Sequence, residues 1–188
     1  VLPYTIGDYL SDDIRTGKIS TDTPEFDAAE KEVSERINFL INNKGTHSVD
    51  HYHKKLGKIM WDKCGMSRNK EGLVAAIEEI SALREDFWKN VLVPGTATEY
   101  NEQLAKAGRV ADFIELGELM MRDALARDES CGGHFREEHQ TDEGEALRDD
   151  TNFAFTSAWE FSGEKTPSKL NKETLEFENV QLTQRSYK

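Results

Sequence analysis

The stretch that decides the fold is residues 69–90, NKEGLVAAIEEISALREDFWKN. Its large apolar side chains recur at intervals of three and four residues: Leu73, Ile77, Ile80, Leu83 and Phe87. This spacing places them along one face of an α-helix. Pro94 and Gly95 follow shortly afterwards, and both residue types end helices. We therefore predict an amphipathic helix that begins near Asn69 and ends before Pro94.

Neighbouring segments repeat this helical pattern. Thr23-Pro24 supplies an N-cap and a first-turn proline for one helix, and Ser48 can cap the next. The expected helices cover about residues 24–43, 48–65 and 98–127. Long antiparallel helices with short connections form a bundle. The sequence thus predicts a mainly α fold.

The two ends differ from this helical middle. A short apolar series from Ile6 to Ile14 predicts a helix that Gly17 ends. Residues 129–134, ESCGGH, form a glycine turn that a helix would not tolerate. Beyond it, apolar residues alternate with smaller or polar ones in two series: Phe153, Phe155, Ser157 and Trp159, then Leu175, Phe177, Asn179 and Gln181. This alternation predicts a two-stranded β extension.

Composition excludes several classes of function. The formal charge of -12 would repel nucleic acid and anionic lipid surfaces. With a mean hydropathy of -0.70, no stretch approaches the roughly 20 apolar residues of a membrane span. Cys64 and Cys131 lack the spacing of a disulfide framework or a zinc site, which favours a reducing cytoplasm. Val1 is preceded by no initiator Met and followed by no signal peptide, so we expect the chain to be part of something longer.

Residues 129–136 are the most unusual stretch chemically. Glu129, Ser130, His134 and Arg136 are the kind of polar group that can hold a buried interdomain junction or an anion. We predict an interdomain or subunit contact at these four residues. A less favoured alternative is a nucleophilic Cys131 activated by His134.

Other candidate sites favour ordinary structural explanations. His47 and His51 have the spacing of two metal ligands, but they and His53 lack an identifiable third partner, so a solvated helix start is favoured over a metal site. The acidic pairs Glu137-Glu138 and Asp149-Asp150 are expected at the solvated surface. Trp61, Trp88 and Trp159 are expected to anchor the core or an interface. No GxGxxG or GKS/T motif occurs, so neither catalytic nor cofactor-binding residues are predicted.

Several segments, in the same order along the chain, resemble one protein family. Residues 56–88, LGKIMWDKCGMSRNKEGLVAAIEEISALREDFW, resemble a stretch of succinate dehydrogenase and fumarate reductase flavoprotein subunits. Residues 129–136, ESCGGHFR, are similar to the family segment ESRGAH-x-R, and residues 184–187 are similar to the family's carboxy terminus. The form of the sequence looks most like the Bacteroidetes-type subunits that accompany a diheme cytochrome. Cys131 stands where most relatives have Arg, and Gly133 where they often have Ala.

The resemblance implies a domain organisation. Residues 1–17 would end a flavin-binding domain, and residues 18–127 would form a three-helix, spectrin-repeat-like bundle. Residues 128–188 would form an extended carboxy-terminal segment with a short β-hairpin. The family's catalytic and flavin-linked residues lie upstream of Val1, so this part is expected to brace the flavin domain without catalysing.

The resemblance also implies a function for the parent subunit. It would use FAD to interconvert succinate and fumarate and pass electrons to an iron–sulfur subunit docked on a membrane cytochrome b anchor, at the cytoplasmic face of the inner membrane. An apolar surface left uncovered would promote self-association of this part. Two alternatives remain open: a free-standing helical protein-interaction module, and a small metalloenzyme built on His47, His51 and His53.

Overall fold

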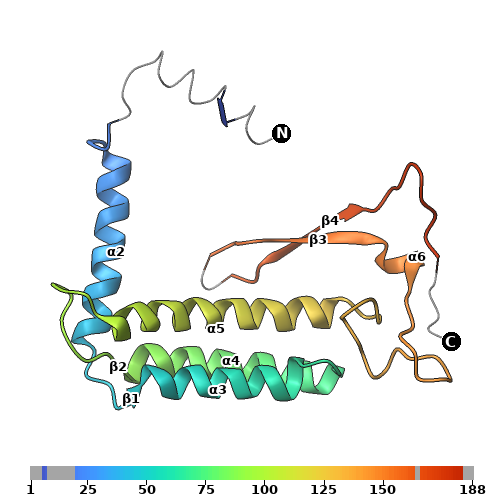
Figure 1. The fold of residues 1–188 in the computed structure, drawn as a ribbon, viewed down its shortest axis with the longest axis horizontal. Coiled ribbons are helices and arrows are strands. Elements are labelled where there is room, and N and C mark those ends of the chain that lie inside the picture. Colours follow the sequence, from blue (N-terminus) through green and yellow to red (C-terminus); the bar gives the residue numbers. More distant parts are fainter. Residues whose placement is uncertain (1–5, 8–19, 164–165, 184–188) are drawn as a thin grey trace.

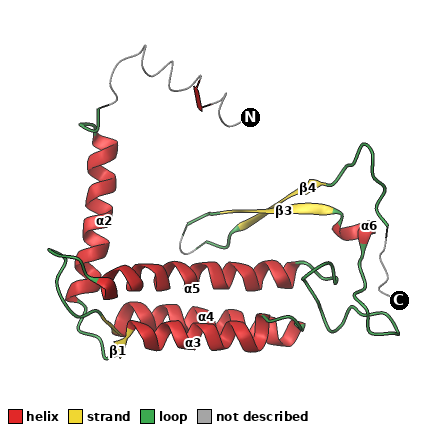
Figure 2. Ribbon diagram, viewed as in Figure 1, coloured by secondary structure: helices red, strands yellow, loops and turns green. Residues whose placement is uncertain are grey.

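A computed structural model describes residues 6–7, 20–163 and 166–183. The expected helix between Ile6 and Ile14, the boundary at residue 17 and the family-like ending at residues 184–187 lie mostly or wholly outside the described residues. The described part is mainly helical, with two small sheets (Figure 2). None of the described helices combines the length and the apolar content that crossing a bilayer requires.

Three antiparallel helices form the bundle: α3 (Val49–Cys64), α4 (Lys70–Asn90) and α5 (Glu102–Ala126) (Figure 1). Their facing residues make one core, to which the helices contribute in order Tyr52, Leu56 and Ile59; Leu73, Ala76, Ile80, Leu83 and Phe87; Ala107, Val110, Ile114 and Met121. Within each helix these positions recur at intervals of three, four or seven residues, so the apolar periodicity of the helix places them on one buried face. The predicted mainly α, three-helix fold is confirmed.

Side-chain caps fix where the bundle helices begin. The Oγ atom of Ser48 accepts from the His51 amide at 3.3 Å, and Oδ1 of Asn69 accepts from the Gly72 amide at 2.8 Å. Both starts match the sequence prediction. The predicted start of the last helix at Thr98 was wrong, because Oδ1 of Asn101 accepts from the Leu104 amide and caps a helix that begins at Glu102.

Helix α2 (Pro24–Asn42) projects away from the bundle (Figure 1). Its sequence predicted both a helix and an apolar face, but Phe26 and Val33 are 48% and 57% exposed. Leu40 is the buried residue of this helix. Only the carboxy-terminal end of α2 is attached to the bundle, through the ring of Phe39 and an Arg36–Asp112 ion pair of 2.9 Å. The helical region thus comprises a three-helix core with α2 as an arm.

A short parallel sheet closes the end of the bundle where α2 is attached. Strand β1 (His47–Ser48) pairs with β2 (Val91–Leu92). The Thr46 amide adds a hydrogen bond of 2.9 Å to the Asn90 carbonyl. At Gly45 a Cβ atom would lie only 2.0 Å from that same carbonyl oxygen, so this approach requires glycine.

The carboxy-terminal segment contains α6 (Asp150–Phe153) and an antiparallel hairpin of β3 (Phe155–Glu160) and β4 (Lys169–Thr174). The first predicted strand is confirmed from Phe155 onward. The second was wrong, because the partner strand is the polar segment before Leu175 rather than the apolar series that starts there. Backbone pairing with β3 places β4, and most of its side chains face solvent, so no apolar alternation was needed.

Candidate functional site

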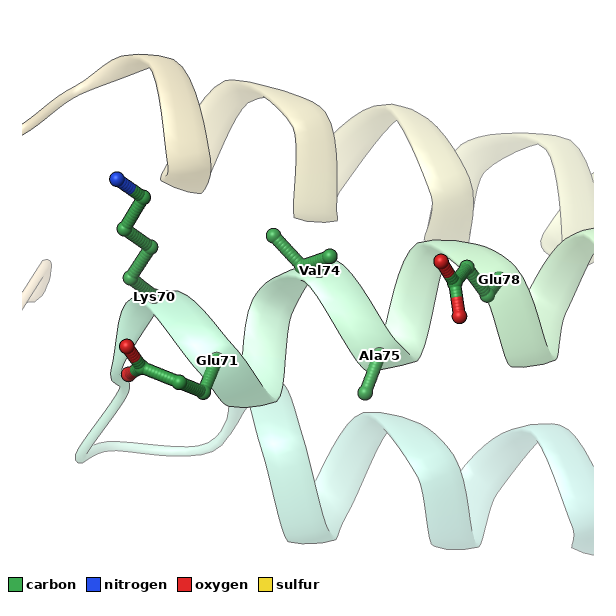
Figure 3. Close-up of a pocket in the computed structure, with 5 residues that line it drawn as sticks. All are labelled: Lys70, Glu71, Val74, Ala75 and Glu78. Atoms are coloured by element: carbon green, nitrogen blue, oxygen red, sulfur yellow. The ribbon is translucent and has the colours of Figure 1, made fainter.

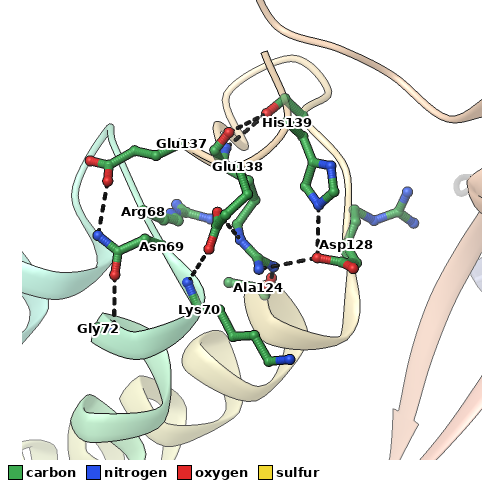
Figure 4. A network of polar contacts seen from close by, with 12 residues as sticks. Arg68, Asn69, Lys70, Gly72, Ala124, Asp128, Glu137, Glu138 and His139 are labelled. Carbon is green, nitrogen blue, oxygen red and sulfur yellow. Dashed lines mark hydrogen bonds and ion pairs between the residues drawn. The ribbon is translucent and has the colours of Figure 1, made fainter.

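The end of the bundle opposite α2 is held by residues 127–150, which we call the clasp (Figures 1 and 4). It contains the four residues predicted as a contact site. Glu129, Ser130 and Arg136 are 2%, 0% and 1% exposed, and His134 is partly buried. Three of the four side chains therefore lie inside this chain, and a contact with another domain or subunit remains a prediction.

The Arg136 guanidinium ties the clasp to helix α5. Its Nη1 donates to the Ala124 carbonyl oxygen in the last turn of α5 at 3.1 Å. Its Nη2 lies 3.1 Å from Asp128 Oδ1, and its Nε donates to Glu138 Oε2 at 3.2 Å. A cation beside the last carbonyl groups of a helix is also favoured by the helix dipole. Buried Arg136 thus joins the helix end to two carboxylates of the clasp.

Backbone pairing attaches the clasp to the turn between α3 and α4. Arg68 and Arg136 form a parallel bridge, in which the Arg68 amide donates to the Phe135 carbonyl at 3.1 Å. Ser130 Oγ accepts from the Arg136 amide at 2.8 Å. The Ser130 hydroxyl therefore satisfies a backbone donor that is buried at this junction.

The acidic pair Glu137-Glu138 fixes the clasp to the start of α4 (Figure 4). Glu137 accepts from Ser67 Oγ at 2.8 Å and from Asn69 Nδ2 at 2.9 Å. Glu138 accepts from the Lys70 amide, where a carboxylate also meets the positive end of the helix dipole. These hydrogen bonds hold the pKa of Glu137 below its usual value, with Asn69 contributing most. Both carboxylates lie near the surface as expected, but each has a structural partner.

Glu129 connects the first residues of the clasp to its last residues. One carboxylate oxygen accepts from Arg127 Nη1 at 2.8 Å, and the other accepts from the Asp149 amide at 2.8 Å. The Asp149 side chain in turn caps α6, and Asp150 pairs with Arg148 at 2.6 Å. The second acidic pair therefore also has structural roles.

Arg127 and Trp159 hold the hairpin against this end of α5. Arg127 donates to the Phe153 and Phe155 carbonyl oxygens at 3.1 and 2.9 Å, and its guanidinium lies 5.0 Å from the Phe155 ring centroid. The Trp159 indole donates to Asp123 Oδ1 at 2.7 Å. Trp159 therefore anchors packing as predicted, and Trp88 does so beside Phe87 and Phe39. Trp61 is 82% exposed, so it is not part of the core, and its place at an interface remains a prediction.

The His134 ring is fixed in one tautomer. Its Nε2 lies 2.8 Å from the Arg127 carbonyl oxygen, which can only accept, so Nε2 carries the proton. Its Nδ1 then accepts from Arg68 Nη1 at 2.8 Å. Burial lowers the pKa of His134, and nearby guanidinium charges lower it further, although the bond to Arg127 opposes this shift. The geometry and charges therefore favour a neutral imidazole.

We expect His134 to make the chain less stable in mild acid. Because folding lowers its pKa below the ordinary value of about 6.5, the unfolded chain binds the proton more readily. The stability due to neutral His134 is therefore present above about pH 6.5 and is lost as the pH falls. The variant His134→Gln keeps a donor for the Arg127 carbonyl but has no imidazole to protonate. When the pH is lowered from about 7 to about 5, its free energy of unfolding, measured by urea titration, should fall less than that of the unchanged chain. His53→Gln serves as the control for removing an exposed histidine, and equal losses in the unchanged chain and His134→Gln would contradict the expectation.

The less favoured alternative, a nucleophilic Cys131 activated by His134, has no geometric support. Both ring nitrogens of His134 are bonded elsewhere, and its backbone rather than its ring pairs with Cys131, through hydrogen bonds of 2.8 and 3.0 Å. The two glycines between them make this a tight turn, with Gly132 at a φ of 60°. The turn therefore presents the imidazole to Arg68 and Arg127.

A small, partly open cavity lies between the clasp and the bundle. It has a volume of about 160 Å³ and is lined by Cys64, Arg68, Met120, Asp123, Ala124, Arg127 and His134. Sequence analysis missed Arg68 and Arg127 as parts of this site. Arg68 lies 66 positions before His134, and no local pattern reports a contact over that distance.

The histidine cluster separates in the structure. The rings of His47 and His51 stack with centroids 4.4 Å apart, whereas the His53 ring lies 5.9 Å from that of Phe113. In the described residues, no group of three or more His, Cys, Asp or Glu side chains could hold a metal ion. The three imidazoles thus do not converge.

A larger depression of about 380 Å³ lies along one face of α4 (Figure 3). It is lined by Lys70, Glu71, Val74, Ala75 and Glu78. In Figure 3 the amine of Lys70 and the carboxylates of the two glutamates point in different directions. This depression is therefore an open helix surface without converging chemical groups.

Residues 53–187 match the protein-family model described as "Fumarate reductase flavoprotein C-term". The match covers more than half of the 188 residues, including most of the bundle, the clasp and the hairpin. The chain belongs to this family. The match confirms the family resemblance that residues 56–88 and 129–136 carried.

Individual members of the fumarate reductase flavoprotein family agree with the match. The chain is 28% identical over 157 residues to the fumarate reductase flavoprotein subunit of Proteus vulgaris, covering 84% of this chain and 24% of the relative. It is 31% identical over 121 residues to the Escherichia coli subunit, covering 64% of this chain and 19% of that subunit. A solved Escherichia coli quinol fumarate reductase has the same fold, with a TM-score of 0.75 and 24% identity over 90% of this chain and 28% of that chain. The chain thus spans between 19% and 28% of the length of these relatives.

Proposed function

We propose that this chain is the carboxy-terminal helical domain of the flavoprotein subunit of a succinate dehydrogenase or fumarate reductase. The observation that carries the proposal is the family match over residues 53–187. The relatives matched are named as flavoprotein subunits, and the match covers 24% of the Proteus vulgaris subunit. The intact protein would interconvert succinate and fumarate, and this domain would support the flavin-binding domain.

The side of the bundle formed by α5 is the proposed contact with the flavin-binding domain. Figure 2 shows α2 and the hairpin both lying on the α5 side of the bundle. Phe113, Leu116 and Met120 on α5 are 43%, 53% and 44% exposed, and they recur at helical spacing. Exposed apolar surface of this kind marks an interaction site. Self-association through it remains a prediction for the chain on its own.

Glu129, Ser130, His134 and Arg136 would serve this contact indirectly. Three of them are buried inside the chain, which favours an indirect role over a direct contact with a partner. They would instead hold the end of α5 and the hairpin in a fixed relation, through the bonds of Arg136 to Ala124 and of Glu129 to Arg127. A fixed surface costs less entropy to dock than a mobile one.

The described residues do not fit FAD. The cavity under the clasp, about 160 Å³, is smaller than the roughly 300–1,000 Å³ of sites for drug-sized ligands. The larger depression on α4 presents Glu71 and Glu78, whose charges would repel a pyrophosphate. We propose that FAD is held by other parts of the intact protein, and we derive no chemical step through it in this chain.

The remaining proposals concern the assembled complex. An iron–sulfur subunit would accept electrons from the flavin, and a membrane cytochrome b would anchor the complex at the cytoplasmic face of the inner membrane. A link to a quinol is supported by one solved structure of similar fold, a quinol–fumarate reductase with menaquinol. The finer resemblance to Bacteroidetes-type subunits remains a prediction.

The purified chain is expected to show no dicarboxylate chemistry. With added FAD, succinate and an electron-accepting dye, we expect dye reduction no faster than with FAD and succinate alone, because the described residues do not fit the flavin. Absorbance of the dye measures the rate, and heat-unfolded chain is the matched control. Saturable, succinate-dependent reduction by the folded chain would contradict this part of the proposal.

The proposed function is tested on the polypeptide that carries this sequence in its cell of origin. An antibody raised against the clasp and hairpin should recover a protein several times longer than this chain, with flavin absorbance and succinate-dependent dye reduction. Recovery of a flavin-free protein of about this chain's size would instead favour the free-standing helical interaction module. This second candidate function is favoured by one observation, the exposed apolar residues of α2 and α5.

A further inference from the structure

We infer that the cavity under the clasp is a binding subsite for a single small carboxylate anion, with Arg68 as its charged ligand. The cavity lies where the end of α3, the last turns of α5 and the glycine turn of the clasp meet. The inference stands on the charges and hydrogen bonds of this chain and does not depend on the proposed function.

The first step is an inventory of the guanidinium groups around His134. Arg127 is paired with Glu129 at 2.8 Å, and Arg136 is paired with Asp128 at 3.1 Å and with Glu138. Arg68 has no ion pair with any carboxylate in the part of the chain that the structure describes. Arg68 and Arg127 both line the cavity, and of these two Arg68 is the one without an anionic partner among the described residues.

The second step concerns the donors that Arg68 leaves over. Its Nε donates to the Gly65 carbonyl at 3.1 Å, and one Nη1 proton goes to His134 Nδ1 at 2.8 Å. These are neutral acceptors, so they position the guanidinium without compensating its charge. Within the described residues, no hydrogen bond uses its Nη2 group. A guanidinium presents its donors in a planar fork that matches the two oxygens of a carboxylate.

The third step is the selectivity of the cavity wall. A volume of about 160 Å³ admits an anion of a few heavy atoms and excludes a nucleotide. Asp123 also lines the cavity, and its Oδ1 is engaged by the Trp159 indole. Its charge opposes an anion more strongly the more negative charge that anion carries. Met120 and Ala124 supply an apolar side for the small alkyl part of the ligand. These features favour a monocarboxylate over sulfate or phosphate.

The test is a titration of the isotopically labelled chain with sodium acetate, at an ionic strength held constant with sodium chloride. We expect saturable NMR shifts confined to the cavity residues Cys64, Arg68 and His134, with a dissociation constant on the order of millimolar, as one charge-assisted contact allows. Helix α2 should show no shift. This mapping on the unchanged chain requires no variant to fold.

Two variants separate the subsite from general charge. Arg68→Gln should weaken acetate binding at least about tenfold, since the fork and its charge are lost. Arg109→Gln is the matched control, because Arg109 is an exposed arginine that also lacks a carboxylate partner among the described residues, and it should bind acetate like the unchanged chain. If Arg68→Gln fails to fold, Ala124→Val, which fills the cavity from α5, should abolish the same shifts.

The outcomes distinguish the source of the carboxylate. Acetate shifts that saturate and disappear in Arg68→Gln support a site for a free anion. Equal shifts with chloride alone, or shifts spread over all exposed arginines, would overturn the inference. So would binding of a blocked peptide, N-acetyl-Ala-Glu-Ala-amide, without binding of acetate, because the cavity would then receive a protein side chain.

Discussion

Arg136→Met is expected to lower the free energy of unfolding by about 2–3 kcal/mol, because it removes three charge-assisted contacts of a buried group. The methionine fills much of the same space but cannot bond the Ala124 carbonyl or compensate Asp128 and Glu138. The loss should stay below the 3–5 kcal/mol typical of a broken buried pair, because Asp128 is 59% exposed and can be solvated. Urea unfolding measures the change, and hydrogen exchange should show faster exchange over residues 127–150.

Arg36→Met is the matched control for Arg136→Met. Arg36 also pairs with an aspartate across two helices, but its side chain is 46% exposed and that of Asp112 is 68% exposed. Exposed ion pairs contribute at most about 1 kcal/mol. If both variants lose the same stability, the clasp does not hold the end of the bundle in the way that its contacts indicate.

Gly45→Ala is expected to cost about 3 kcal/mol, since overpacking of a site that cannot yield has costs of that order. The added Cβ would lie 2.0 Å from the Asn90 carbonyl oxygen and 2.5 Å from that of Val91, and backbone atoms cannot rotate away. Relief requires separation of β1 from β2, which breaks the hydrogen bond of the Thr46 amide. Thermal unfolding followed by circular dichroism measures the effect.

Gly57→Ala provides the opposite control at another glycine. Gly57 lies in the interior of α3, and a Cβ there would meet nothing within 4 Å. Alanine in an exposed helix position is favoured over glycine by about 0.5–1 kcal/mol, so this variant should be more stable than the unchanged chain. A similar destabilisation of both variants would show that glycine content, rather than the approach at Gly45, determines the result.

The bundle could be predicted because its helices carry their own boundary signals. Asn69 and Ser48 cap helices at the positions that the sequence indicated, and the buried face of α4 follows its apolar spacing. The same spacing in α2 correctly predicted a helix, but it did not predict that the apolar face of this helix is exposed. An apolar face indicates that another surface covers it, but it does not indicate where that surface lies. The start of α5 was predicted too early because Tyr100 continues the apolar series of this helix. Tyr100 precedes the N-cap and is 88% exposed.

The candidate site was predictable in composition but not in arrangement. Glu129, Ser130, His134 and Arg136 were identified because charged and small residues gather around a glycine turn. Their partners in the turn before α4 could not be read from the sequence, since contacts of long sequence separation leave no periodic signal. The polar strand β4 escaped prediction for a related reason: its place is set by backbone pairing with β3.

The bridge between the clasp and the turn before α4 has a consequence for the order of folding. Asn69 and Glu137 are 68 positions apart, whereas most helix contacts of the bundle join α4 to its chain neighbours α3 and α5. Closing a long loop costs entropy before its contacts form, so short-range structure assembles earlier. The bundle would therefore reach its transition state with the clasp still open. Substitutions at Arg136 should then mainly accelerate unfolding and leave the refolding rate nearly unchanged.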